Sequence, residues 1–207
     1  MSTEIYDGGQ LLPVMEEFYT LQGEGLYTGT AAYFLRIGGC DIGCNWCDSK
    51  ASWSLGLHPL LKVDEIIERI KQFPAKSVVV TGGEPTIYPL GYLCDKLKEN
   101  GIKTFLETSG AYAISGKWDW ICLSPKFQAP PLLGNYSLAS ELKVIIERME
   151  DLQWAEENAL LVGRDCYLFL QPEWSRKGFI LDDIIQYIER NPRWRLSLQM
   201  HKYIGIP

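Results

Sequence analysis

The sequence predicts an α/β fold, arranged as a partial (β/α) barrel with reduced helix content. Two observations support this fold class: strand-like runs alternate with amphipathic stretches, and some links between strands are too short for a crossover helix. The strand-like runs are rich in β-branched and aromatic residues, and they cover 31–37, 77–80, 103–107, 118–123, 141–146, 167–170 and 194–199.

Apolar side chains recur at helical spacing between several of these strands. Three stretches are apolar at positions i, i+3, i+4 and i+7, and they start at Val63, Leu90 and Leu181. This period predicts one helix in each stretch, with one buried face. A further helix is expected at 152–162, whereas the links at 110–117 and 127–140 carry no helical period. The barrel is therefore expected to lack helices at these two links.

The chain has 207 residues, and one domain, 1–207, is the expectation at this length. Its core is expected at 31–207. Residues 1–30 are expected to form a flanking N-terminal hairpin or extension, because apolar residues surround a turn at Gly23 and Gly25.

Composition excludes several classes of partner. The formal net charge is −6, and acidic and basic residues are interleaved, so no basic stripe is available for nucleic acid. No apolar run approaches the roughly 18 residues of a membrane span, and the first residues do not resemble a secretion leader. We therefore expect a cytoplasmic protein that binds neither nucleic acid nor membrane.

Three of the six cysteines are clustered on a glycine-rich loop after the strand at 31–37. They are Cys40, Cys44 and Cys47. Thiolates bind zinc or iron–sulfur clusters, and three of them leave one iron of a four-iron cluster free for another ligand. The alternative is a zinc site completed by a distant residue such as His58 or His201.

The cysteine loop resembles the CxxxCxxC loop of the radical S-adenosylmethionine (SAM) superfamily, with Trp46 just before the third cysteine. Residues 82–85, Gly-Gly-Glu-Pro, are similar to the motif that follows the next strand in that superfamily. The resemblance implies a 4Fe–4S cluster whose open iron binds SAM, and an adenosyl radical formed when an electron splits SAM. It also implies that the partial barrel is of the radical SAM type.

Further motifs resemble the 7-carboxy-7-deazaguanine synthase family, in the same order and over nearly the whole chain. They lie at 18–25, 106–110, 123–126, 141–144, 171–172 and 199–207. The resemblance implies a lyase that converts 6-carboxy-5,6,7,8-tetrahydropterin to 7-carboxy-7-deazaguanine and ammonia, a step toward queuosine and other deazapurines. A homodimer and an electron donor such as flavodoxin or ferredoxin are implied as partners.

The family resemblance also implies roles for individual positions. The SAM-binding positions would be Trp46, Cys47, Asp48, Gly83, Ser124, Pro125, Lys126, Gln171, Pro172, Glu173 and Trp174. The substrate-binding positions would be Leu21, Gln22, Gly23, Glu24, Arg36, Thr81, Glu107 and Pro207. Ser49 stands where the family places a magnesium ligand, often threonine, so Mg²⁺ is a third expected cofactor.

The chemistry of a pterin is consistent with these assignments. Carboxylates such as Glu24 and Glu107 can accept hydrogen bonds from its guanidine-like edge, and Arg36 can grip its carboxylate. The α-carboxylate of Pro207 is expected to accept from the amino and ring N–H groups.

Two alternatives remain at this point. Within the superfamily, the chain could be a glycyl-radical activating enzyme, although such an enzyme should lack the motifs at both ends. From another class, it could be a non-catalytic binding module that is stabilised by zinc or a cluster.

Overall fold

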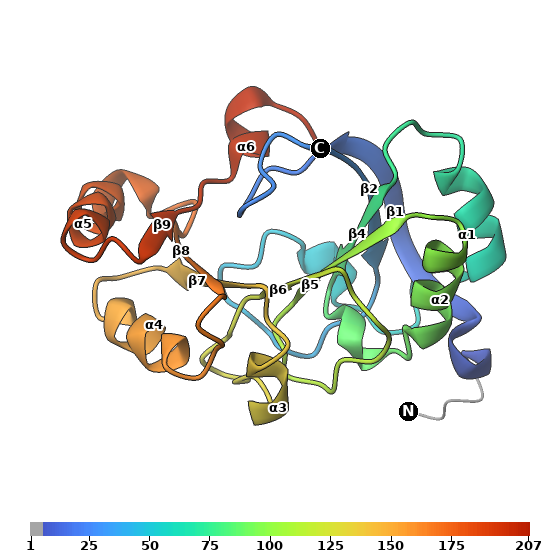
Figure 1. The fold of residues 1–207 in the computed structure, drawn as a ribbon, viewed down its shortest axis with the longest axis horizontal. Helices are drawn as coiled ribbons and strands as arrows, with labels where there is room; N and C mark the ends of the chain where they lie inside the picture. The colour runs from blue at the N-terminus through green and yellow to red at the C-terminus, as the bar shows by residue number, and fades with distance from the viewer. Residues whose placement is uncertain (1–5) are drawn as a thin grey trace.

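The computed structural model describes residues 6–207, and within them the strands form one nine-stranded sheet (Figure 1). The order across the sheet is β3-β1-β2-β4-β5-β6-β7-β8-β9. The strands are β1 (Leu11–Leu21), β2 (Ala31–Ile37), β3 (Leu60–Lys62), β4 (Ser77–Gly82), β5 (Lys103–Thr108), β6 (Trp120–Leu123), β7 (Glu141–Ile146), β8 (Tyr167–Pro172) and β9 (Trp194–Leu196).

The sheet is parallel from β2 to β9 and antiparallel at its first edge. There β1 pairs with both β2 and β3 in antiparallel register. The edge strands β3 and β9 are not paired with each other, so the barrel remains open. The structure thus confirms the predicted partial barrel, and it assigns the segment before Ala31 to the sheet as β1.

The described residues form six α-helices, most of which cover the outer face of the curved sheet, while the last lies beside the loop after β1. They are α1 (Val63–Ile70), α2 (Gly91–Glu99), α3 (Leu133–Tyr136), α4 (Asp151–Ala159), α5 (Lys177–Arg190) and α6 (Met200–Ile204). Figure 1 shows α1 and α2 at one end of the sheet and α4 and α5 at the other. Within the described chain no helix joins β5 to β6, so the predicted reduction in helix content is confirmed. None of the described helices has the length and apolar character needed to cross a bilayer.

Each end of the sheet has its own apolar core on this outer face. Residues such as Leu35, Val80 and Leu106 pack with α1 and α2, and Leu142 and Leu170 pack with α4 and α5. Because successive side chains of a strand point to opposite faces, the neighbours of these core residues point inward. The inward positions include polar residues, and they face the cavity described below.

The structure differs from the sequence expectations at three short elements. Residues 127–140 were expected to lack a helix, yet they contain the single turn α3. The strand expected at 194–199 ends at Leu196, and a short helix, α6, starts at Met200. Elements of three to five residues are too short to show a hydrophobic period, so pattern analysis does not detect them.

Candidate active site

A cavity of about 700 Å³ opens at the carboxyl ends of the parallel strands. It is bounded by the loop after β2, by the ends of β4 to β8, and by the last residues of the chain. All the candidate residues named from the sequence line this cavity except Pro125, which is buried elsewhere. The structure therefore brings together residues from position 21 to position 207.

The cysteine loop follows β2 and is anchored by backbone hydrogen bonds. Gly39 N donates to Ser52 O at 2.6 Å, and Cys40 N donates to Trp53 O at 3.1 Å. Two side chains donate to cysteine sulfurs: Gln128 Nε2 lies 3.1 Å from Cys44 Sγ, and Trp53 Nε1 lies 3.2 Å from Cys47 Sγ. Such N–H donors stabilise thiolate ligands, so the donor set and its surroundings fit an iron–sulfur cluster.

The ionisation of these thiols depends on what they bind. Burial raises the pKa of Cys40 and that of Cys44, where the nearby Lys126 charge opposes the rise. Both thiols are therefore protonated in the metal-free protein at neutral pH, and cluster binding releases their protons.

The cysteines are not arranged around a single point in this structure. Among residues 6–207, no three His, Cys, Asp or Glu side chains converge on a point that could hold one ion. A four-iron cluster needs no such convergence, because each cysteine binds a different iron.

The Gly-Gly-Glu-Pro segment connects the end of β4 to the cysteine loop and to β5. A Cβ on Gly83 would lie 2.3 Å from Gly39 O, so only glycine permits this approach. The Glu84 carboxylate is 1% exposed and accepts hydrogen bonds from the hydroxyl groups of Thr86, Thr108 and Ser109 and from the backbone N–H groups of Thr86 and Ser109. Glu84 therefore fixes the ends of two adjacent strands at the cavity wall.

The candidates after β6 form a small polar group. Lys126 Nζ donates to Ser124 O at 2.6 Å and to Ser124 Oγ at 2.7 Å. The same ammonium lies 5.4 Å from the centre of the Trp46 ring, within range of a cation–π interaction. Burial lowers the pKa of Lys126. The loop after β6 and the cysteine loop are thus in contact beside Cys44.

The candidates at the end of β8 already make contacts with neighbouring side chains. Gln171 Oε1 accepts from Ser197 Oγ at 2.7 Å, while Glu173 accepts from Ser175 and Arg176 in the turn before α5. The Trp174 ring stacks edge-on against Tyr203 and lies 3.2 Å below Lys177 Nζ. The Glu173 and Trp174 side chains therefore hold the turn and α6 together.

Arg36 and Ser49 are direct neighbours. Arg36 Nη1 donates to Ser49 Oγ at 3.0 Å, and Arg36 Nε donates to Glu16 Oε1 at 2.5 Å. Thr81 on β4 and Leu21 at the end of β1 line the same cavity. A guanidinium beside a hydroxyl is a suitable pair for a carboxylate ligand.

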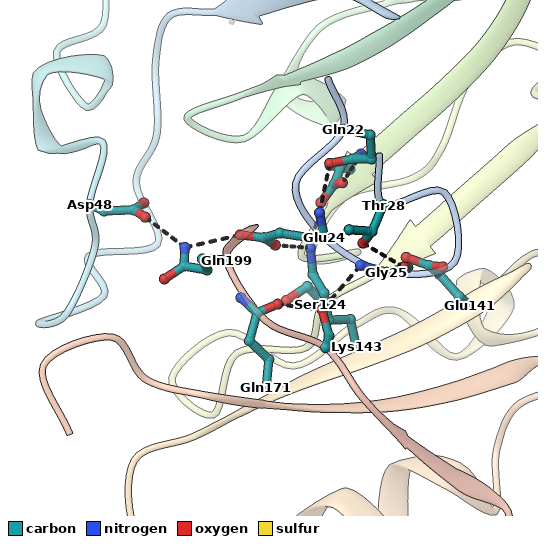
Figure 2. A network of polar contacts seen from close by, with 12 residues as sticks. Gln22, Glu24, Gly25, Thr28, Asp48, Ser124, Glu141, Lys143, Gln171 and Gln199 are labelled. Carbon is teal, nitrogen blue, oxygen red and sulfur yellow. Dashed lines mark hydrogen bonds and ion pairs between the residues drawn. The ribbon is translucent and has the colours of Figure 1, made fainter. Parts of the chain in front are cut away.

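A second polar network lines the cavity (Figure 2). Lys143 Nζ contacts Glu107 Oε2 at 2.8 Å and also contacts Glu24 Oε2. Gln22 Nε2 donates to Glu107 Oε1 at 3.0 Å, and Gln199 Nε2 donates to Glu24 Oε1 at 2.9 Å. Burial by itself would raise the pKa of Glu24, but the Lys143 ammonium and these hydrogen bonds bring it below its usual value.

The last residues of the chain complete the cavity. Gly23 O accepts from Met200 N at 2.9 Å, and His201 packs on Gly23. Burial lowers the pKa of His201, against the opposing charge of Glu24. Pro207 also lines the cavity.

Sequence reasoning missed several residues of this site. Trp53 and Gln128 were not singled out at all, while Lys143, Gln199, His201 and Lys202 lie in the motifs at 141–144 and 199–207 but were given no role in SAM or substrate binding. Lys143 carried a signal, because a lysine inside the run Glu-Leu-Lys-Val-Ile-Ile is unusual in a buried strand. Trp53 and Gln128 gave none, because a loop residue looks the same in sequence whether or not it reaches a cavity.

Comparisons with known proteins agree with this geometry. A family model described as the Radical SAM superfamily matches residues 35–115. The 7-carboxy-7-deazaguanine synthase of Flavobacterium psychrophilum is 53% identical over 199 residues, covering 96% of this chain and 94% of the relative. That of Synechocystis sp. is 45% identical, covering 94% and 93%. The crystal structure of QueE from Escherichia coli superposes with a TM-score of 0.82 at 30% identity, covering 97% of this chain and 99% of that one.

The fold, the three-cysteine loop and the superfamily match define a radical SAM enzyme, a class that uses a 4Fe–4S cluster and SAM. Within that class, the chain belongs to the 7-carboxy-7-deazaguanine synthase family. The alternatives of a glycyl-radical activating enzyme and a zinc-binding module find no support among these relatives.

Proposed function

We propose that this enzyme converts 6-carboxy-5,6,7,8-tetrahydropterin to 7-carboxy-7-deazaguanine with release of ammonia, as a carbon–nitrogen lyase of deazapurine biosynthesis. The observation that carries the proposal is the composition of the cavity. Three thiols, a guanidinium beside a hydroxyl, and a pair of carboxylates all line one space of about 700 Å³. That volume is in the range of small-molecule sites and can hold a cofactor and a bicyclic substrate together.

The thiols of Cys40, Cys44 and Cys47 would hold the cluster. The SAM-binding residues would be Trp46, Cys47, Asp48, Gly83, Ser124, Lys126, Gln171, Pro172, Glu173 and Trp174, with Pro125 shaping the loop from behind. When bound, the cluster and SAM supply one-electron chemistry that removes a hydrogen atom from the substrate. The protein would orient the substrate and exclude water from the cavity beside the cluster.

Arg36 would bind the substrate carboxylate, and Ser49 would hold a magnesium ion against it. The support is the contact between Arg36 and Ser49, because Mg²⁺ favours oxygen ligands and keeps part of its water shell. The remaining substrate residues would be Leu21, Gln22, Gly23, Glu24, Thr81, Glu107 and Pro207. Glu24 and Glu107 would accept hydrogen bonds from the guanidine-like edge.

The partners beyond the small-molecule substrate are part of the same proposal. An electron donor such as flavodoxin or ferredoxin would reduce the cluster, and two chains would form a homodimer. These partners and the cytoplasmic location stay predictions.

One anaerobic assay tests the proposed reaction. The reconstituted enzyme is reduced with SAM and with carboxypterin deuterated at carbon 6, and the product and SAM are analysed by mass spectrometry. We expect the deazaguanine product, SAM that survives many turnovers, and deuterium in the recovered SAM. Conversion of SAM to free 5′-deoxyadenosine without a deazaguanine would contradict the proposal.

A further inference from the structure

Lys143 is a charged residue whose side chain is almost completely buried. Its side chain is 4% exposed, and its ammonium contacts the carboxylates of Glu24 and Glu107, which are 15% and 20% exposed (Figure 2). Burying an unpaired ammonium is costly, so these contacts account for its position. The three residues come from the loop after β1, from β5 and from β7, so no local sequence feature brings them together.

The contacts leave acceptor positions free on both carboxylates. An ionised carboxylate offers about four lone-pair positions. Glu24 uses one for Lys143 and one for Gln199, and Glu107 uses one for Lys143 and one for Gln22. Since both residues line the cavity, their remaining positions are available to a ligand.

We propose that Lys143 is a positioning residue of the substrate site: its ammonium keeps Glu24 ionised and holds Glu24 and Glu107 in place as paired acceptors for a donor edge. This inference deepens the proposed function and rests on it, because the donor edge is the amino and ring N–H group of a pterin. The Lys143 ammonium points at the two carboxylates, so Lys143 acts on the substrate through them.

Other titratable groups also face Lys143, and the acidic ones favour its charged form while Lys126 and His201 oppose it. Glu141 lies on its own strand, Cys122 lies on β6, Lys126 lies in the loop after β6, and His201 lies on α6. Burial alone would lower the pKa of Lys143, but the neighbouring acidic groups, Cys122, Glu107, Glu24 and Glu141, raise it well above its usual value. The ammonium is therefore charged at neutral pH.

Removing the ammonium has a defined consequence. Two buried carboxylates that share no cation repel each other, so one of them takes up a proton near neutral pH. Its new O–H group would then face the N–H donors of the pterin, and an acceptor would be lost. At higher pH the proton leaves and the acceptor returns, so the defect is reversible.

Binding measurements against pH test this sequence of events. The substrate would be titrated into enzyme with SAM and an oxidised cluster, so that no turnover occurs, between about pH 6 and about pH 9. We expect Lys143→Met to bind the carboxypterin about ten- to a hundredfold more weakly than the parent at the low end, and to recover most of the loss at the high end. Lys143→Arg should retain parental affinity because it keeps the charge.

Lys96→Met serves as the matched control. Lys96 pairs with Glu99 on the exposed face of α2, far from the cavity, so its variant should follow the parent at every pH. A Lys143→Met variant that binds equally weakly over the whole pH range would overturn the inference.

A second measurement is independent of the substrate. Infrared difference spectra of Lys143→Met should show the carbonyl stretch of a protonated carboxylic acid near neutral pH, and the parent should not. The double variant Lys143→Met with Glu24→Gln has one carboxylate fewer, which relieves the repulsion between the two carboxylates. It should therefore lack this band. It also serves as a better-folded substitute if the single variant is unstable.

The two measurements separate the two hypotheses. If the band appears but the parent does not bind the carboxypterin, the proposed function fails while the charge role of Lys143 stands. If the parent binds the pterin but Lys143→Met shows no protonated acid, the role of Lys143 is refuted.

Discussion

Gly23 and His201 are packed so closely that a Cβ on Gly23 would lie 2.3 Å from His201 Nδ1. The two residues are also linked through the backbone, because Gly23 O accepts from Met200 N. The loop after β1 and the C-terminal helix α6 therefore close one side of the cavity together. Their contact depends on the absence of a side chain at position 23.

The first prediction follows from this contact. Gly23→Ala should displace His201 and α6, and the KM for the carboxypterin should rise about tenfold or more, since misplacement by about 1 Å can cost up to about a hundredfold. Cluster content should be unchanged. Gly163→Ala, where a Cβ meets nothing within 4 Å, is the control for steady-state kinetics. A parental KM in Gly23→Ala would show that α6 does not shape the site.

Residues appended after Pro207 should also weaken substrate binding. Because Pro207 lines the cavity, added residues would obstruct it and would remove the negative charge at this position. We expect a loss of about ten- to a hundredfold in affinity, equivalent to roughly 1.5–3 kcal/mol for charge-assisted hydrogen bonds. Equilibrium binding with the oxidised enzyme measures it, and an amino-terminal tag is the control. Parental affinity in the extended protein would exclude Pro207 from the site.

Each of the three loop cysteines should be required for the cluster. Replacing Cys40, Cys44 or Cys47 by Ala should abolish SAM cleavage and lower the iron content, because two thiolates do not anchor a four-iron cluster. Cys94→Ala is the control, since Cys94 lies on the buried face of α2 and is 1% exposed. Normal iron content and turnover in Cys44→Ala would invalidate the cluster assignment.

Trp53 should tune the reduction potential of the cluster. In the parent, the Trp53 N–H group donates to Cys47 Sγ and so stabilises the more negative, reduced state of the cluster. Trp53→Phe removes this donor. With about 0.5–1.5 kcal/mol per hydrogen bond and 59 mV per tenfold change for one electron, the potential should fall by roughly 20–60 mV. Potentiometric titration followed by electron paramagnetic resonance measures this shift. Trp118→Phe, which loses a hydrogen bond to Ser115 O far from the cysteines, should leave the potential unchanged.

Ser49 should affect the magnesium response alone. Ser49→Ala should raise the apparent Mg²⁺ requirement of turnover, because it removes the oxygen beside Arg36, while SAM binding and iron content stay normal. Magnesium titration of the initial rate provides the measurement. Superimposable titration curves for variant and parent would exclude Ser49 as a ligand.

The sequence by itself determined the fold class and the cysteine site. Strand composition and helical period are local patterns, and they located β2 and β7 with the bounds that the structure shows. The cysteine spacing and the Gly-Gly-Glu-Pro segment are also local, because each is held within one loop.

Only the tertiary structure decided how the charged residues of the substrate wall are combined. Lys143 is 119 residues from Glu24, and Gln199 is 175 residues from it. Their contacts depend on the register of neighbouring strands, on the curvature of the sheet and on the return of α6 to the loop after β1. A one-residue shift in register would turn Lys143 to the other face of the sheet, so its partners are fixed by packing and not by its neighbours in sequence.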